Sequence, residues 1–161
     1  MTKTSITLIG AALFSAAILT PATAATIDLP QYGFTIEALD APPSATTSTT
    51  ALMTFLPASD GFAPNINVNI QPYPGKIANY ITMSKDQFKK MNWVVVTEKQ
   101  NGENEWIVEY TGQMQGKDLH FYARAVTKGG KVYLVTAAAK ESQWNTVSGI
   151  LRRNVDAFKT K

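Results

Sequence analysis

The chain has 161 residues, of which 15 are Lys or Arg and 12 are Asp or Glu, giving a formal net charge of +3. This small and scattered positive excess argues against nucleic acid as a partner, because nucleic-acid binders cluster their basic residues on one surface. The chain has no cysteine, which excludes disulfides, thiol nucleophiles and cysteine metal sites, so packing alone must hold the fold.

Residues 1–24 have the pattern of a secretory signal peptide. Lys3 supplies a positive start, Ile6 to Leu19 form an apolar segment, and Ala22 to Ala24 form a small-residue cleavage site. The apolar segment is shorter than the roughly 20 residues of a membrane-spanning helix. We therefore expect cleavage, a periplasmic or secreted product without stable membrane insertion, and a single domain over residues 25–161.

Extended segments and loops alternate over the next part of the chain. Strand-like alternation of apolar and polar residues occupies 27–39, as two short pieces, and then 51–56 and 65–72. The intervening segments 41–50 and 57–64 are rich in Pro, Ser, Thr or Gly and are predicted to be loops. Loops on a rigid scaffold often carry recognition, so both are candidate binding segments.

Two segments place apolar residues at helical spacing. The first, 76–91, follows Pro74 and ends with lysines, which favour the helix dipole. The second, 142–159, has Ser142 as its candidate N-cap. Its apolar stripe consists of Trp144, Val147, Leu151, Val155 and Phe158. Gly149 is unfavourable inside a helix, so we expect it to mark a close approach to the sheet.

A meander of strands is predicted between these helices. The strands are expected at 93–99, 105–114, 119–125 and 131–138, with turns at Asn101-Gly102, around Gly116 and at Gly129-Gly130. The last strand is apolar on both faces and should be central. The pattern predicts an α+β fold, an antiparallel β-sheet meander sandwiched by helices.

Three stretches carry a family resemblance. They are Pro64–Pro74 (PNINVNIQPYP), Ser84–Trp93 (SKDQFKKMNW) and Gly129–Ala138 (GGKVYLVTAA). Together they resemble the PsbP-like superfamily, which includes the photosystem II extrinsic protein P, the Mog-type factors and bacterial DcrB-like exported proteins. The resemblance implies an α/β/α sandwich and proteins that mostly bind and stabilise partners. It implies no catalytic residues that could be carried over.

Candidate catalytic residues are few. His120 is the single histidine, and the chain has no G-x-S-x-G motif, so we expect no catalytic site and place His120 on a solvated or helix-covered polar face. Glu105 and Glu109 share a strand face but lie too far apart for paired acid–base work, so solubility and edge protection are expected of them.

Asp118 and His120 are weak candidates for a metal site. They are two residues apart on a predicted strand, so their side chains point to the same face. A zinc site needs at least three protein ligands, and the sequence indicates no third. We therefore expect neither a metal nor a cofactor.

Three aromatic residues are candidates for a binding surface. Trp106 and Tyr110 share one face of their strand, and Tyr122 lies on the neighbouring strand. Two interpretations stay open: the rings pack beneath a helix, or they form an exposed aromatic surface.

These observations lead to an expected function. We expect an exported, non-enzymatic accessory or partner-binding protein of the bacterial cell envelope, with a protein partner. The alternative is a binder of a small molecule or lipid, with a pocket between sheet and helix. A hydrolase that uses Asp118, His120 or the glutamates is a third hypothesis.

Overall fold

The computed structural model describes residues 26–30, 32–37 and 50–161. The strands are β1 Thr26–Leu29, β2 Phe34–Glu37, β3 Thr50–Phe55, β4 Asn65–Pro72, β5 Val94–Asn101, β6 Glu105–Met114, β7 Lys117–Lys128, β8 Lys131–Lys140 and β9 Lys159–Thr160. The helices are α1 Ile77–Lys90 and α2 Glu141–Asp156. A large antiparallel sheet has the order β3-β4-β8-β7-β6-β5, and a small sheet has the order β1-β2-β9.

The large sheet is built from hairpins, as the turn residues predict. Gln115 and Gly116 have φ angles of 52° and 73°, and Gly129 and Gly130 have 58° and 73°. Two consecutive positive φ angles are what a two-residue hairpin turn needs. The apolar strand β8 lies in the interior of the sheet between β4 and β7, which confirms the central position predicted for it.

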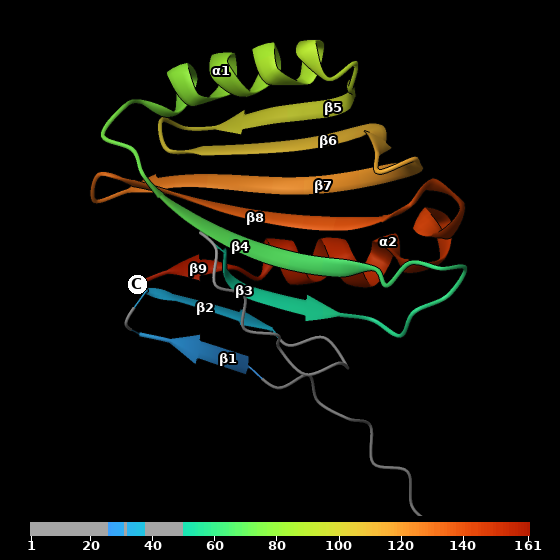
Figure 1. Ribbon diagram of the computed structural model, residues 1–161. Coiled ribbons are helices and arrows are strands. Elements are labelled where there is room, and N and C mark those ends of the chain that lie inside the picture. The colour runs from blue at the N-terminus through green and yellow to red at the C-terminus, as the bar shows by residue number, and fades with distance from the viewer. Residues whose placement is uncertain (1–25, 31, 38–49) are drawn as a thin grey trace, which may run out of the picture.

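One helix covers each face of the large sheet, so the predicted α+β sandwich is confirmed. Figure 1 shows α1 over the β5 end and α2 on the other side of the sheet, beside the small sheet. On the α1 face, Ile77 and Tyr80 bury themselves against side chains of β6, β7 and β8. On the α2 face, Leu151 and Val155 pack with Phe34 of the small sheet, which closes that side of the core.

Helix α2 differs from its predicted boundaries at both ends. Its N-cap is Lys140, not Ser142, and the side chain of Gln143 accepts a hydrogen bond of 3.1 Å from the Lys140 backbone N–H. After Asp156 the chain leaves the helix, yet Phe158 stays buried. The next two residues form the unpredicted strand β9, which pairs with β2.

Gly149 does not touch the sheet, so that prediction is wrong. The residue is exposed on the outer face of α2, and a Cβ placed on it would meet only the Arg153 guanidinium, at 3.8 Å. The glycine therefore weakens the helix without a packing reason.

The predicted loop 57–64 is bonded to the start of α2. Gln143 Nε2 donates to the Ser59 carbonyl at 2.6 Å, and Lys140 Nζ lies 3.0 Å from Asp60 Oδ2. This loop is thus a fixed part of the surface, and the Lys140 ammonium lowers the pKa of Asp60.

The structure does not describe two of the predicted segments. The leader 1–24, and the predicted loop 41–50 apart from Thr50, lie outside the described residues. In the part of the chain that the structure describes, neither helix is long and apolar enough to cross a membrane.

Candidate functional site

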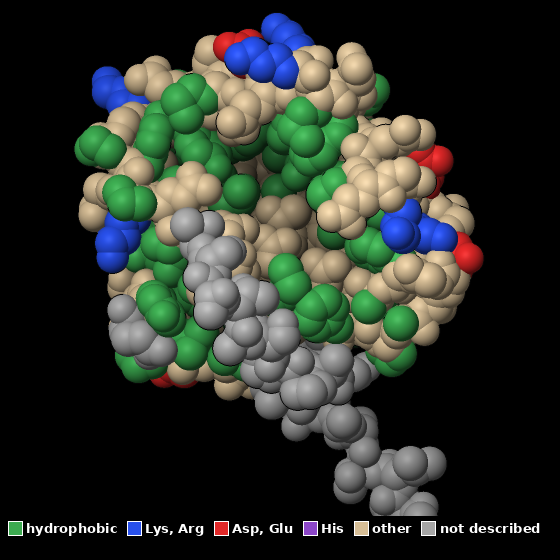
Figure 2. Space-filling view, viewed as in Figure 1, with side chains coloured by type: hydrophobic (Ala, Val, Ile, Leu, Met, Phe, Trp, Pro, Cys, Tyr) green, Lys and Arg blue, Asp and Glu red, His purple; other side chains and the backbone are tan. Residues whose placement is uncertain are grey.

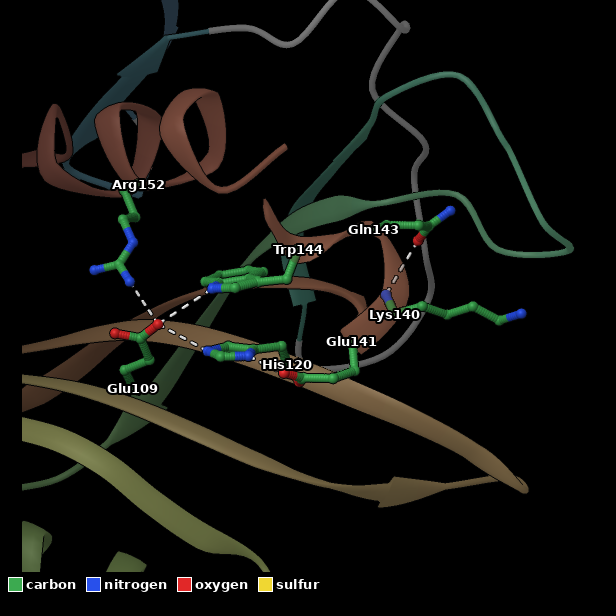
Figure 3. A network of polar contacts seen from close by, with 7 residues as sticks. All are labelled: Glu109, His120, Lys140, Glu141, Gln143, Trp144 and Arg152. Atoms are coloured by element: carbon green, nitrogen blue, oxygen red, sulfur yellow. Dashed lines mark hydrogen bonds and ion pairs between the residues drawn. The ribbon is translucent and has the colours of Figure 1, made fainter. Parts of the chain in front are cut away.

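A polar cluster lies between α2 and the sheet and contains the single histidine. Oε1 of Glu109 on β6 lies 2.7 Å from His120 Nε2, 3.2 Å from Trp144 Nε1 and 2.5 Å from an Arg152 nitrogen. Figure 3 shows Trp144 and Arg152 reaching from α2 to this carboxylate. Three donors compensate the burial of the Glu109 charge, which would otherwise be costly.

His120 is held on both ring nitrogens. Its Nδ1 lies 2.8 Å from Oε2 of Glu141, the first residue of α2, and its ring stacks on Trp144 at 4.1 Å between centroids. An ionised carboxylate only accepts hydrogen bonds, so both contacts are satisfied together when both nitrogens carry protons. Through these two contacts His120 on β7 links Glu109 on β6 to the first residue of helix α2.

Hydrogen bonds from side chains of β7 also hold the C-terminal end of α2 against the sheet. Tyr122 donates to Asp156 Oδ1 at 2.9 Å, and Arg124 donates to the backbone carbonyl oxygens of Asp156 and Phe158 at 2.8 and 3.0 Å. Burial, followed by the bond to Asp156, raises the pKa of Tyr122 to about 12. Arg124 therefore satisfies the Asp156 carbonyl, which the helix C-terminus leaves free, and the Phe158 carbonyl just beyond the helix.

His120 is enclosed by this cluster. It is 6 % exposed, and both of its ring nitrogens have carboxylate partners. The helix-covered alternative for its strand face is confirmed by its burial under α2.

The expected role of Glu109 in solubility is wrong, because its side chain is buried in the cluster. Strand β6 lies inside the sheet, and β5 forms the edge. Glu105 is half-buried: burial alone would raise its pKa, but bonds from Asn101 and Arg124 outweigh this effect and lower it. Sequence alternation put both glutamates on one face correctly, but it could not show that α2 and Arg124 cover that face.

Asp118 and His120 share a strand face but not a site. The Asp118 carboxylate accepts a hydrogen bond of 2.8 Å from Gln113 Nε2, whereas His120 is enclosed by glutamates. Among residues 26–30, 32–37 and 50–161, no group of three or more His, Cys, Asp or Glu side chains is arranged to hold a metal ion.

The three aromatic candidates are buried and lie on opposite faces. Trp106 and Tyr110 belong to the core beneath α1, where Tyr110 stacks on Phe88 of the helix at 4.3 Å. Tyr122 belongs to the core beneath α2. The exposed-surface alternative for these rings is therefore wrong, because each sheet face that carries them has its own covering helix.

Two surface features were not singled out by the sequence. The first is a set of exposed apolar side chains around the start of the edge strand β5, which we call the β5 patch: Met91, Val94 and Val96. They are 49 %, 62 % and 56 % exposed. Valines in a β-branched run look like core residues, and only the sheet order shows that this strand is at the edge.

The second feature is a pocket of about 480 Å³ on the α1 face of the sheet, beside the helix rather than beneath it. Its lining comes from β3, β4, the end of β6, β7 and β8, together with the 57–64 loop and the β6–β7 turn. Figure 2 shows this side of the molecule hollowed near its centre, with hydrophobic side chains around the hollow. This pocket differs from the one expected between sheet and helix, because no α1 residue lines it.

Comparisons with known proteins agree with this architecture. The family model for PsbP matches residues 70–160, more than half of the chain. The chain belongs to the PsbP family. The matched region of this chain runs from the end of β4 through α1, the meander and α2 to β9, so it includes both helices and the polar cluster. No curated protein matches the chain in sequence.

Solved structures share the PsbP fold at low sequence identity. Cyanobacterial PsbP from Synechocystis is 14 % identical with a TM-score of 0.65, and the match covers 92 % of this chain and 99 % of that one. A protein of unknown function from Pseudomonas aeruginosa is 13 % identical with a TM-score of 0.63, covering 87 % and 99 %. LpqN of Mycobacterium tuberculosis, which is involved in cell envelope biogenesis, is 12 % identical with a TM-score of 0.55, covering 86 % of each chain.

Proposed function

We propose that the protein is an exported, non-enzymatic accessory protein of the bacterial cell envelope that binds a protein partner through the β5 patch. The β5 patch is the observation that carries this proposal. Met91, Val94 and Val96 lie within six residues of one another, and the two valines are more than half exposed. Apolar side chains grouped on an exposed edge strand are typical of surfaces that a partner covers.

The irregular edge of β5 favours contact with a single partner over repeated strand pairing. The register between β5 and β6 shifts between Val95 and Thr97, and Glu98 and Lys99 follow on the same strand. A bulge and charged residues limit open-ended strand pairing. The partner we propose therefore presents an apolar surface to the three side chains, and it does not extend the sheet indefinitely.

Export is supported by the leader pattern of residues 1–24, with its positive start, apolar segment and Ala22-Thr23-Ala24 site. An envelope role is further supported by the likeness in fold to LpqN. The non-enzymatic part of the proposal is supported by His120, which is enclosed by two carboxylates and Trp144.

The test compares the wild-type protein with the double variant Val94→Ser, Val96→Ser as bait in envelope extracts. Lys131→Ser is the matched control, because Lys131 is exposed in the β7–β8 hairpin, away from the patch. Thermal unfolding of each bait checks that the fold is intact.

The expected result is one envelope protein that, once purified, binds the wild type and the control but binds the double variant at least tenfold more weakly. Equal binding by all three baits, or self-association of the bait as the only patch-dependent contact, would contradict the proposal.

A further inference from the structure

The pocket beside α1 has an apolar floor and a partly apolar wall. The floor is formed by the buried side chains of Leu119, Phe121 and Ala138. Met53 and Phe55 of the edge strand β3 form part of the wall. The volume of about 480 Å³ falls within the range of small-molecule sites, roughly 300–1,000 Å³.

One charged side chain lines this pocket. Lys117 begins β7 on the same strand face as Leu119 and Phe121, and its side chain is half-buried. Among the described residues, no ion pair or hydrogen bond engages its ammonium group. Its neighbour Asp118 points to the other face of the strand, where it is bonded to Gln113.

Amide side chains are the other polar groups of the pocket. Asn65, Asn67 and Gln115 line it, and none of them carries a charge. The pocket therefore combines an apolar interior with one unpaired positive charge. A neutral ligand would leave this charge unused, and a cationic ligand would be repelled by it.

We propose that this pocket binds an amphiphile with a single alkyl chain and an anionic head group. The chain lies over Leu119, Phe121 and Ala138, and the head group pairs with the Lys117 ammonium. This site goes beyond the proposed function, because none of the three β5 patch residues lines it.

The experiment measures binding of dodecyl probes to the purified protein by calorimetry, below the concentration at which each probe forms micelles. Dodecanoate and dodecyl phosphate distinguish a carboxylate from a phosphate head group. Dodecyltrimethylammonium and dodecyl maltoside supply the cationic and neutral comparisons.

Three variants locate the binding. Lys117→Met removes the charge, and Lys131→Met removes an exposed lysine that does not line the pocket. Ala63→Trp fills the mouth of the pocket from its loop side. Met53→Glu serves as a second blocking variant if the tryptophan impairs folding, since it places a charge in the apolar wall.

We expect at least one anionic probe to bind at least fivefold more tightly than the cationic and neutral probes. Lys117→Met should remove about a fivefold preference, the upper end for a solvent-accessible ion pair. Lys131→Met should leave the preference unchanged, and a blocking variant should abolish binding of every probe. The proposal is overturned if no anionic probe binds, or if the anionic probes bind no more tightly than the cationic and neutral probes. It is also overturned if binding survives both blocking variants.

Discussion

His120 Nε2 on β7 lies 2.7 Å from Glu109 Oε1 on β6, so a buried pair of side chains joins two neighbouring strands of the sheet beneath helix α2. Two residues of α2 contact this pair: Glu141 contacts His120, and Arg152 contacts Glu109. The only histidine of the chain is therefore held inside this cluster. We propose recognition at two other places, the β5 patch and the pocket beside α1.

Removing the Glu109 charge should destabilise the protein strongly. In Glu109→Gln, the side chain keeps its shape, but the Arg152 guanidinium loses its buried counter-charge. Breaking a buried ion pair from one side costs about 3 kcal/mol. Urea unfolding measures the loss, and Glu103→Gln, on an exposed residue, is the matched control. A loss no larger than that of the control would show that the cluster contributes little.

Two glycine substitutions should change stability in opposite directions. A Cβ on Gly112 would lie 2.1 Å from the ring of Trp93, which is stacked on Tyr110, so the indole would have to leave its place. Overpacking of this kind costs about 1–3 kcal/mol in Gly112→Ala. In Gly149→Ala the new methyl group meets no obstacle, and the helix should gain about 1 kcal/mol. Thermal unfolding of both variants checks the two signs, and the same sign for both would contradict the packing described here.

Stability should fall in alkaline solution partly through Tyr122. Folding raises its pKa from 10.0 to about 12, so above pH 10 the unfolded chain ionises first and the folded state loses stability until about pH 12. In Tyr122→Phe this contribution is absent, although the hydrogen bond to Asp156 is lost as well. The stability difference between wild type and variant should therefore shrink as the pH rises above 10, as measured by urea unfolding. A constant difference would contradict the raised pKa.

The leader predicts a defined processed product. Cleavage after Ala24 would leave Ala25 as the first residue. Mass spectrometry of the protein recovered from the envelope fraction should find that N-terminus. Ala22→Arg together with Ala24→Arg, which destroys the small-residue site, should leave the precursor uncut. Full-length protein in the wild-type strain would contradict export by this route.

Much of the fold could be predicted from the sequence, because the residue patterns that indicate each strand and helix are local. Alternation in 65–72 and helical spacing in 76–91 match β4 and α1 within about two residues. Strand β9 could not be predicted in this way, because two residues have no periodicity and their partner β2 is far away in the chain.

The candidate site was harder to predict from the sequence. Glu109 occupies a polar position in an alternating strand, so only the placement of α2 reveals that it is buried. For the same reason the valines of β5 look like core residues until the sheet order shows an edge. Lys117 is one lysine among many in the sequence, and its place in an apolar pocket depends on several strands, a loop and a turn.

Site-specific photo-crosslinking in intact cells tests the central claim, that the β5 patch is a partner-binding surface, most directly. A photoreactive amino acid is placed at Val96 and, as a control, at Lys131. The account predicts one defined adduct with another envelope protein from position 96, lost on Val94→Ser, and none from position 131. Equal labelling from both positions, or no adduct from position 96, would contradict it.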